Sequence, residues 1–119
     1  MKKTLVIGAS QNPARYSFKA IHKLKYYGHE VLALGLKPGN AEGTTIATGT
    51  PQFKEVNTVT LYLSEKNQAP MEDYILSLNP KRIIFNPGAE NQSLKTKADK
   101  AGIETVEACT LVMLSIGGY

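Results

Sequence analysis

The stretch LVIGASQNPARYS, residues 5–17, decides the fold of this chain. It opens with an apolar run that ends in glycine, a pattern typical of a central strand covered on both faces. A dinucleotide-binding loop would continue as G-x-G-x-x-G, because its tight turn, its approach to pyrophosphate and its helix contact each exclude a side chain. Here Gly8 is followed by Ala9 and Ser10, and no further glycine precedes Ser17. The loop predicts contacts with phosphate but not a close dinucleotide fit.

Length and composition limit the classes of protein that the chain can belong to. Its 119 residues, 42% apolar and 20% charged, predict a single domain over residues 1–119 with one core. The net charge is +4, from 14 basic and 10 acidic residues that are scattered along the chain, so nucleic acid is not an expected partner. With one cysteine, Cys109, and only a short apolar run after Lys3, we expect a cytoplasmic protein that does not bind a membrane.

Strand and helix patterns alternate along the chain. Apolar or β-branched runs predict strands at 3–8, 31–34, 58–63, 82–85 and 103–106, while the Gly- and Thr-rich segment 37–57 offers at most a short edge strand near 44–47. Helical spacing predicts helices over 17–27 and 71–78, a third helix that ends at Gly102, and a short apolar helix within 109–116.

This alternation predicts an α/β fold, because each crossover must lay its helix back on a parallel sheet. We expect a three-layer, Rossmann-like, doubly wound parallel sheet of about five strands in the order 3-2-1-4-5. Ligands of such sheets bind outside the carboxyl ends of the strands, at the point where the strand order reverses. The segments 8–17, 35–39, 63–66, 86–89 and 107–110 are expected to meet there.

Residues at this edge favour a ligand that carries phosphate. NAD-dependent enzymes usually place an acidic side chain after the second strand to hold the ribose, but this chain has Lys37 there. A lysine suits a phosphate on the adenosine ribose, as in NADP or coenzyme A. The hydroxyls of Ser10 and Ser17 and the guanidinium of Arg15 add donors for phosphate oxygens.

Four segments of the chain resemble the small bacterial CoA-binding domain proteins, whose fold also forms the nucleotide-binding part of the succinyl-CoA synthetase alpha chain. These segments are VIGASQNPARYS (6–17), ALGLKPG (33–39), FNPGAEN (85–91) and AGIETVEACT (101–110). The chain departs from the family at Asn86, where glutamine is more common, and at Ala108, where arginine is more common.

The resemblance implies that CoA or an acyl-CoA lies across the carboxyl edge, with its pyrophosphate near Gly8, Ala9 and Ser10 and its adenosine near Lys37 and Pro38. The predicted cofactor-binding residues are Gly8, Ala9, Ser10, Arg15, Ser17, Lys37, Pro38, Leu63, Asn86, Pro87 and Gly88.

The sequence predicts ligand binding without evident catalysis. His22 and His29 fall away from the expected site, no set of residues has metal-ligand spacing, and Cys109 is expected to be a small buried residue. Two alternatives stay open: an NADP-binding oxidoreductase-like domain, and a domain without a ligand that serves as an interaction module. The apolar tail is also compatible with a homodimer.

Overall fold

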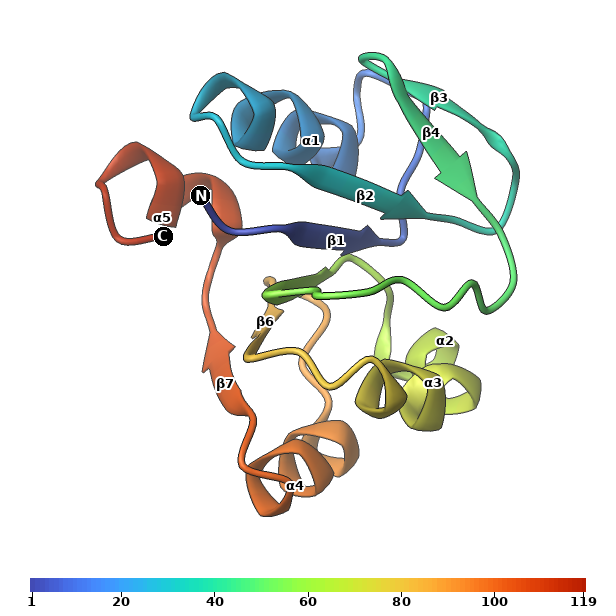
Figure 1. Cartoon of the computed structure of the whole chain (residues 1–119), viewed down its shortest axis with the longest axis vertical. Helices are drawn as coiled ribbons and strands as arrows, with labels where there is room; N and C mark the ends of the chain where they lie inside the picture. Colours follow the sequence, from blue (N-terminus) through green and yellow to red (C-terminus); the bar gives the residue numbers. More distant parts are fainter.

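The computed structural model describes residues 1–119. Its strands form one seven-stranded sheet in the order β3-β4-β2-β1-β5-β6-β7 (Figure 1). The strands are β1 (Thr4–Ile7), β2 (Val31–Leu34), β3 (Gly39–Ala41), β4 (Thr44–Ala47), β5 (Thr58–Leu61), β6 (Arg82–Phe85) and β7 (Glu104–Glu107). The helices are α1 (Tyr16–Tyr26), α2 (Glu65–Gln68), α3 (Glu72–Ser77), α4 (Gln92–Lys100) and α5 (Thr110–Ser115), with the 3-10 turn η1 (Ala69–Met71) between α2 and α3. None of these helices is long and apolar enough to cross a bilayer.

The Rossmann-like α/β architecture is confirmed, but the sheet is larger than expected and mixed rather than wholly parallel. Six strands run parallel. The five strands that the sequence predicts correspond to β1, β2, β5, β6 and β7, and they stand in the order 2-1-3-4-5 rather than the expected 3-2-1-4-5, because β5 pairs with β1 and the place beside β2 is taken by β4. Only β3 is antiparallel, paired with β4.

The antiparallel strand was missed because its turn carries a weak sequence signal. Glu42 and Gly43 connect β3 to β4 with φ angles of 53° and 82°. Two successive residues with positive φ suit the two-residue turn of a β-hairpin, but glutamate is an uncommon residue in the first of these positions. The Asn40 side chain accepts a hydrogen bond from the Gly43 amide at 3.0 Å, which holds the turn.

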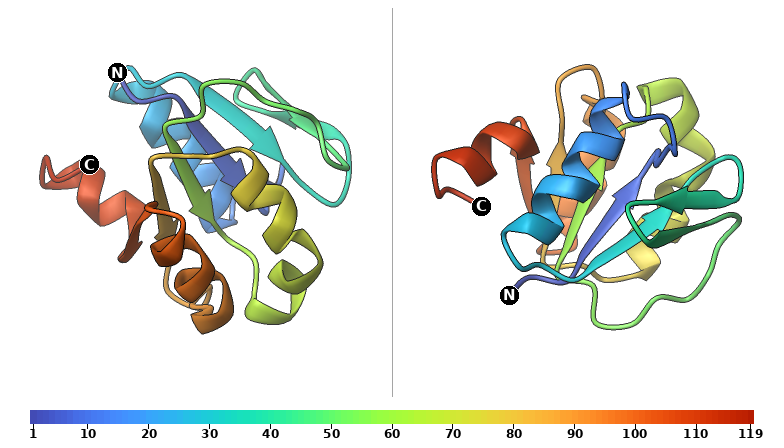
Figure 2. Two further views of the ribbon diagram at one scale, coloured as in Figure 1. Left: turned by 60° about the horizontal axis from the view of Figure 1, so that its bottom comes forward. Right: turned by 90° about the horizontal axis from the view of Figure 1, so that it is seen from above.

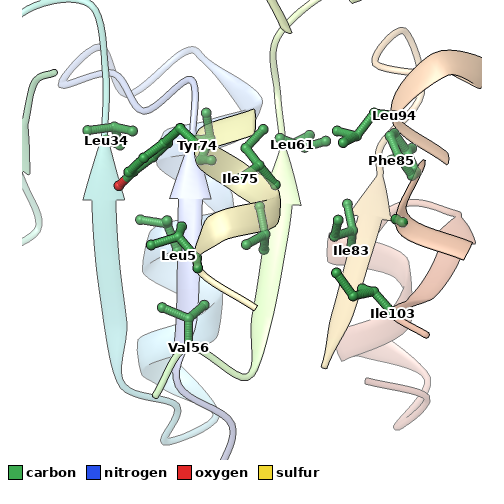
Figure 3. Close-up of a cluster of buried hydrophobic side chains, with 14 of the residues drawn as sticks. Leu5, Leu34, Val56, Leu61, Tyr74, Ile75, Ile83, Phe85, Leu94 and Ile103 are labelled. Carbon is green, nitrogen blue, oxygen red and sulfur yellow. The ribbon is translucent and has the colours of Figure 1, made fainter. Parts of the chain in front are cut away.

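Alternation along the strands distributes the core over two faces of the sheet. In β1, Leu5 and Ile7 join the larger cluster under α3 and α4, which Figure 3 shows, while Val6 joins the smaller cluster with α1 and α5. Helices therefore cover both faces, with α1 and α5 on one and α2, α3 and α4 on the other (Figure 1 and Figure 2). This is the three-layer arrangement that the sequence predicts.

At the carboxyl edge, β1 and its neighbours leave two positions without room for a side chain. A Cβ atom on Gly8, whose φ is +91°, would lie 2.9 Å from the main-chain carbon and oxygen of Tyr62. A Cβ atom on Gly35 would lie 2.6 Å from the main-chain oxygen of Ala9. The amides of Gly8 and Ala9 both donate to the Leu34 carbonyl, at 2.9 and 3.0 Å. The ends of β2, β1 and β5 are thus packed backbone against backbone.

At the opposite, amino edge, Tyr119 closes the sheet over a buried arginine. The Arg82 side chain is only 7% exposed, donates from Nε to the Thr58 hydroxyl at 3.2 Å, and donates from Nη1 to the main-chain oxygen of Tyr119 at 3.2 Å. The Tyr119 ring lies over the guanidinium, 4.5 Å from its carbon, and the phenol hydrogen-bonds the Thr4 hydroxyl at 2.6 Å. The two chain ends accordingly lie side by side (Figure 1).

The close packing at Gly8 gives a matched pair of glycine substitutions. Gly88 has nearly the same φ, +88°, but a Cβ atom there meets nothing within 4 Å. We expect Gly88→Ala to lower the free energy of unfolding by about 1–2 kcal/mol through backbone strain alone. Gly8→Ala should cost about 1–3 kcal/mol more, because the Tyr62 backbone must move. Urea denaturation of both variants measures the difference, and equal losses would contradict the close approach.

The contacts of Tyr119 predict that this residue stabilises the folded protein. Tyr119→Ala should lower the free energy of unfolding by about 3 kcal/mol, because it removes the ring that covers the buried Arg82 charge. Tyr119→Phe keeps the ring and should cost only about 1 kcal/mol, the value of one hydrogen bond to Thr4. Chemical denaturation checks both values. A Tyr119→Ala variant as stable as Tyr119→Phe would refute the role of the ring.

Candidate functional site

A groove of about 540 Å³ runs along the carboxyl edge of the sheet. The first loop and the start of α1 line one side, and the segments that follow β2, β5 and β6, with Ile46 of β4, line the rest. Ten of the eleven predicted site residues line this groove: Gly8, Ala9, Ser10, Arg15, Ser17, Lys37, Pro38, Leu63, Pro87 and Gly88. The structure therefore brings together loops that are far apart in the sequence, at the edge where the strand order reverses.

Asn86 is the predicted residue that does not line the groove. Its side chain is 2% exposed and donates to the Thr60 hydroxyl at 2.7 Å and to the Leu61 carbonyl at 2.8 Å. Its oxygen accepts from the Thr110 amide at 2.9 Å. These bonds join β6 to β5 and to the start of α5, so the amide of Asn86 supports the fold beneath the groove.

The donors for an anion lie at the start of α1 rather than at Gly8 and Ala9, whose amides already bond Leu34. The main-chain amides of Tyr16, Ser17 and Phe18 have no acceptor within the protein, and Arg15 makes no side-chain cap. Free amides at a helix N-terminus, together with the helix dipole, favour an anion. The Ser17 hydroxyl also has no partner, and it stands beside these amides in the groove lining.

The electrostatic character of the groove is positive. Arg15 and Lys37 are the charged side chains of its lining, and neither forms an ion pair. The lining contains no His, Cys, Asp or Glu, and it offers hydrogen-bond donors and apolar contacts. Tyr62 also lines the groove, and burial raises the pKa of its phenol far above the ordinary value, so this group stays neutral.

An apolar side cavity of about 220 Å³ adjoins the groove. It shares Gly8, Leu36 and Leu63 with the groove and continues to Leu34 and Met71 on the α3 face of the sheet. No charged residue lines it. Leu36 is 82% exposed, which is unusual for leucine, and it stands where the groove and the side cavity meet. A compact, weakly polar group of a ligand would be desolvated here.

Seven lining residues were not named as site residues from the sequence, and two of them, Ile46 and Tyr62, also lie outside the segments expected to meet here. The seven are Gln11, Tyr16, Leu36, Ile46, Tyr62, Ser64 and Ala89. Most of them carry no chemical signal in the sequence, since a leucine or alanine after a strand is as common in a core as in a site. Leu36 is the exception, because it directly precedes Lys37 in the segment after the strand predicted at 31–34, which was expected to reach the site.

Comparison with known proteins identifies the family and the fold of the chain. The model of the CoA binding domain family matches residues 2–115 of the chain. A solved structure described as an uncharacterized protein is 49% identical, with a TM-score of 0.98, and the match covers 100% of this chain and 98% of that one. Among curated proteins none matches.

Two more distant structures share the fold. A hypothetical protein from Pyrococcus horikoshii is 21% identical, with a TM-score of 0.88 over 97% of this chain and 82% of that chain. A protein from Thermus thermophilus is 19% identical, with a TM-score of 0.85 over 99% of this chain and 91% of that one. Because the family model spans nearly the whole chain and the groove carries the donors expected for a phosphate-bearing nucleotide, this protein belongs to the CoA-binding domain family.

Proposed function

We propose that the groove binds coenzyme A or an acyl-CoA. The observation that carries this proposal is the set of unpaired donors along one groove: the free amides at the start of α1, with Arg15 and Lys37 and no acidic side chain. CoA carries a pyrophosphate and a ribose 3′-phosphate, so it needs positive charge at two places along its length. Membership of the CoA-binding domain family supports the same ligand.

Each part of CoA has a counterpart in the site. The pyrophosphate would lie at the start of α1, where the amide and hydroxyl of Ser17 donate. The 3′-phosphate would meet Lys37, and the adenine would fill the apolar side cavity between Leu36 and Leu63. The pantetheine arm would then run along the wall formed by Pro87 and Gly88.

This arrangement supports a binding protein that acts as a carrier, sensor or regulator. The donors bind and orient a ligand, and the polar groups left over in the lining are hydroxyls and amides without an adjacent base. An NADP-binding role uses the same phosphate chemistry, since NADP also carries a ribose phosphate and a pyrophosphate. An interaction module without a ligand would leave the donors at the start of α1 unused.

A panel of nucleotides separates these three functions. In thermal unfolding, a ligand present at about 100 times its dissociation constant should stabilise the protein by roughly 2.7 kcal/mol. We expect CoA to raise the melting temperature more than NADP or ATP at equal concentration. A larger effect of NADP would favour the oxidoreductase-like alternative, and no effect of any of the three would favour the interaction module.

The assignment of Lys37 predicts a specific loss on mutation. Lys37→Ala should weaken CoA binding by about 10- to 150-fold, which corresponds to about 1.5–3 kcal/mol for a charge-assisted hydrogen bond. Dephospho-CoA lacks the 3′-phosphate, so its affinity should be lower in the wild type and nearly unchanged by the mutation. Calorimetric titration measures all four combinations.

Lys100→Ala provides the matched control, because Lys100 is an exposed lysine at the end of α4 and does not line the groove. This variant should bind CoA as the wild type does. Equal affinity of the wild type for CoA and dephospho-CoA would exclude the contact between Lys37 and the 3′-phosphate, even if CoA proved to be the ligand.

A further inference from the structure

One wall of the groove consists of two loops that a single side chain joins. Leu63 follows β5 and Ala89 follows β6, and both line the groove. The main-chain oxygens of these two residues both accept hydrogen bonds from Nε2 of Gln68, at 2.8 and 2.7 Å. Gln68 lies at the end of α2 and is completely buried. Its amide therefore fixes the separation of the two loops from behind the wall.

The orientation of this amide is fixed by a second side chain. Asn91, which is 1% exposed, donates from Nδ2 to Oε1 of Gln68 at 3.0 Å. A rotated Gln68 amide would bring its oxygen against the two carbonyls and its nitrogen against the Asn91 donor, and it would lose all three bonds. Asn91 is held in turn by α4, because its oxygen accepts from the Leu94 amide at 3.2 Å as the N-cap of that helix.

A buried carboxylate anchors the other end of this network. Oε2 of Glu72 accepts from Asn91 at 3.0 Å, and Oε1 accepts from Ser93 and Lys97, each at 2.9 Å. Burial would raise the pKa of Glu72, but the bonds from Lys97, Asn91 and Ser93 outweigh it and lower the pKa. Glu72 is thus an ionised acceptor at neutral pH and directs the Asn91 amide. Neither of the two unpartnered buried atoms in the protein belongs to this network.

We propose that Gln68 is a positioning residue that sets the shape of the wall facing the pantetheine arm, an inference that rests on the proposed binding of CoA. A fully satisfied buried network costs little in stability only while all its members stay in place, so it holds one geometry rather than several. Of the residues proposed to hold the nucleotide half of CoA, the start of α1, Lys37 and Leu36 do not contact this network, and only Leu63 does, through its carbonyl. Loss of the Gln68 amide should therefore weaken binding of the arm more than binding of the nucleotide.

The test compares CoA with adenosine 3′,5′-bisphosphate, which lacks the arm. Gln68→Met keeps the length of the side chain but removes the amide, and it leaves the carbonyls of Leu63 and Ala89 without a partner. We expect calorimetric titration to show a loss of about tenfold or more in CoA affinity and of less than about threefold in bisphosphate affinity. Tyr74→Phe is the control, because it removes a 2.6 Å hydrogen bond to Pro51 on the same face of the sheet but away from the groove. This control should change stability without changing either affinity.

A second variant, Asn91→Ser, tests the same role if the Gln68→Met protein does not fold. Asn91→Ser keeps a hydroxyl that can cap α4 but removes the amide that orients Gln68, so it should show the same split between the two ligands at a smaller magnitude. Equal losses for both ligands, or CoA affinity unchanged in the folded variants, would overturn the positioning role while leaving CoA binding intact. A wild-type protein that binds neither ligand would overturn the proposed function itself and this inference with it.

Discussion

The close approach of three strand ends at the carboxyl edge is the constraint on which the rest of this structure depends. Gly8 and Gly35 accept no side chain because the backbones of Tyr62 and Ala9 already occupy the space. The floor between β2, β1 and β5 is therefore main chain, and its amides at Gly8 and Ala9 are bonded to Leu34. Ligand-facing groups must come from the loops around this floor and from the start of α1. The result is a groove with free donors on one side and apolar surface beside it.

The charged groups at the two edges of the sheet have different surroundings. Those at the carboxyl edge are available to a ligand, whereas the one at the amino edge is packed into the fold. At the carboxyl edge, the charges of Lys37 and Arg15 form no ion pair, and the amides at the start of α1 have no acceptor. At the amino edge, the charge of Arg82 is buried and covered by Tyr119. Between the edges, Thr60 and Thr110 hydrogen-bond each other at 2.8 Å and attach α5 to the sheet. The unpaired charges of the groove therefore lie where a ligand can satisfy them, whereas Nη2 of the buried Arg82 has no hydrogen-bond partner.

Much of the fold could be predicted because strand and helix periods are strong local signals. Local sequence signals mark the strand at 4–7, the helix that begins at Tyr16, and the glycines Gly28, Gly102 and Gly117 that end α1, α4 and α5. The hairpin of β3 and β4 could not be predicted, because a glutamate such as Glu42 gives no sequence signal for a positive φ.

The helix expected over 71–78 is present as α3, but the helical turns of α2 and η1 that precede it, from Glu65 to Met71, were not predicted. For the site, strand ends predicted which loops meet, but not which atoms remain free. The side chain of Asn86 and the main-chain amide of Ala9 could each bind a ligand. Only the three-dimensional structure shows that both are already hydrogen-bonded within the protein.

The most direct test of CoA binding in this groove is a nuclear magnetic resonance titration of the ¹⁵N-labelled protein with CoA. Binding as described here predicts that the largest shifts fall on the amides of Ser17, Leu36, Leu63 and Gly88, from four segments that meet only at the carboxyl edge. The amides of the amino edge, such as that of Arg82, should stay unchanged. Shifts centred on the amino edge or on the exposed side of α5, or no shifts at millimolar CoA, would contradict the account.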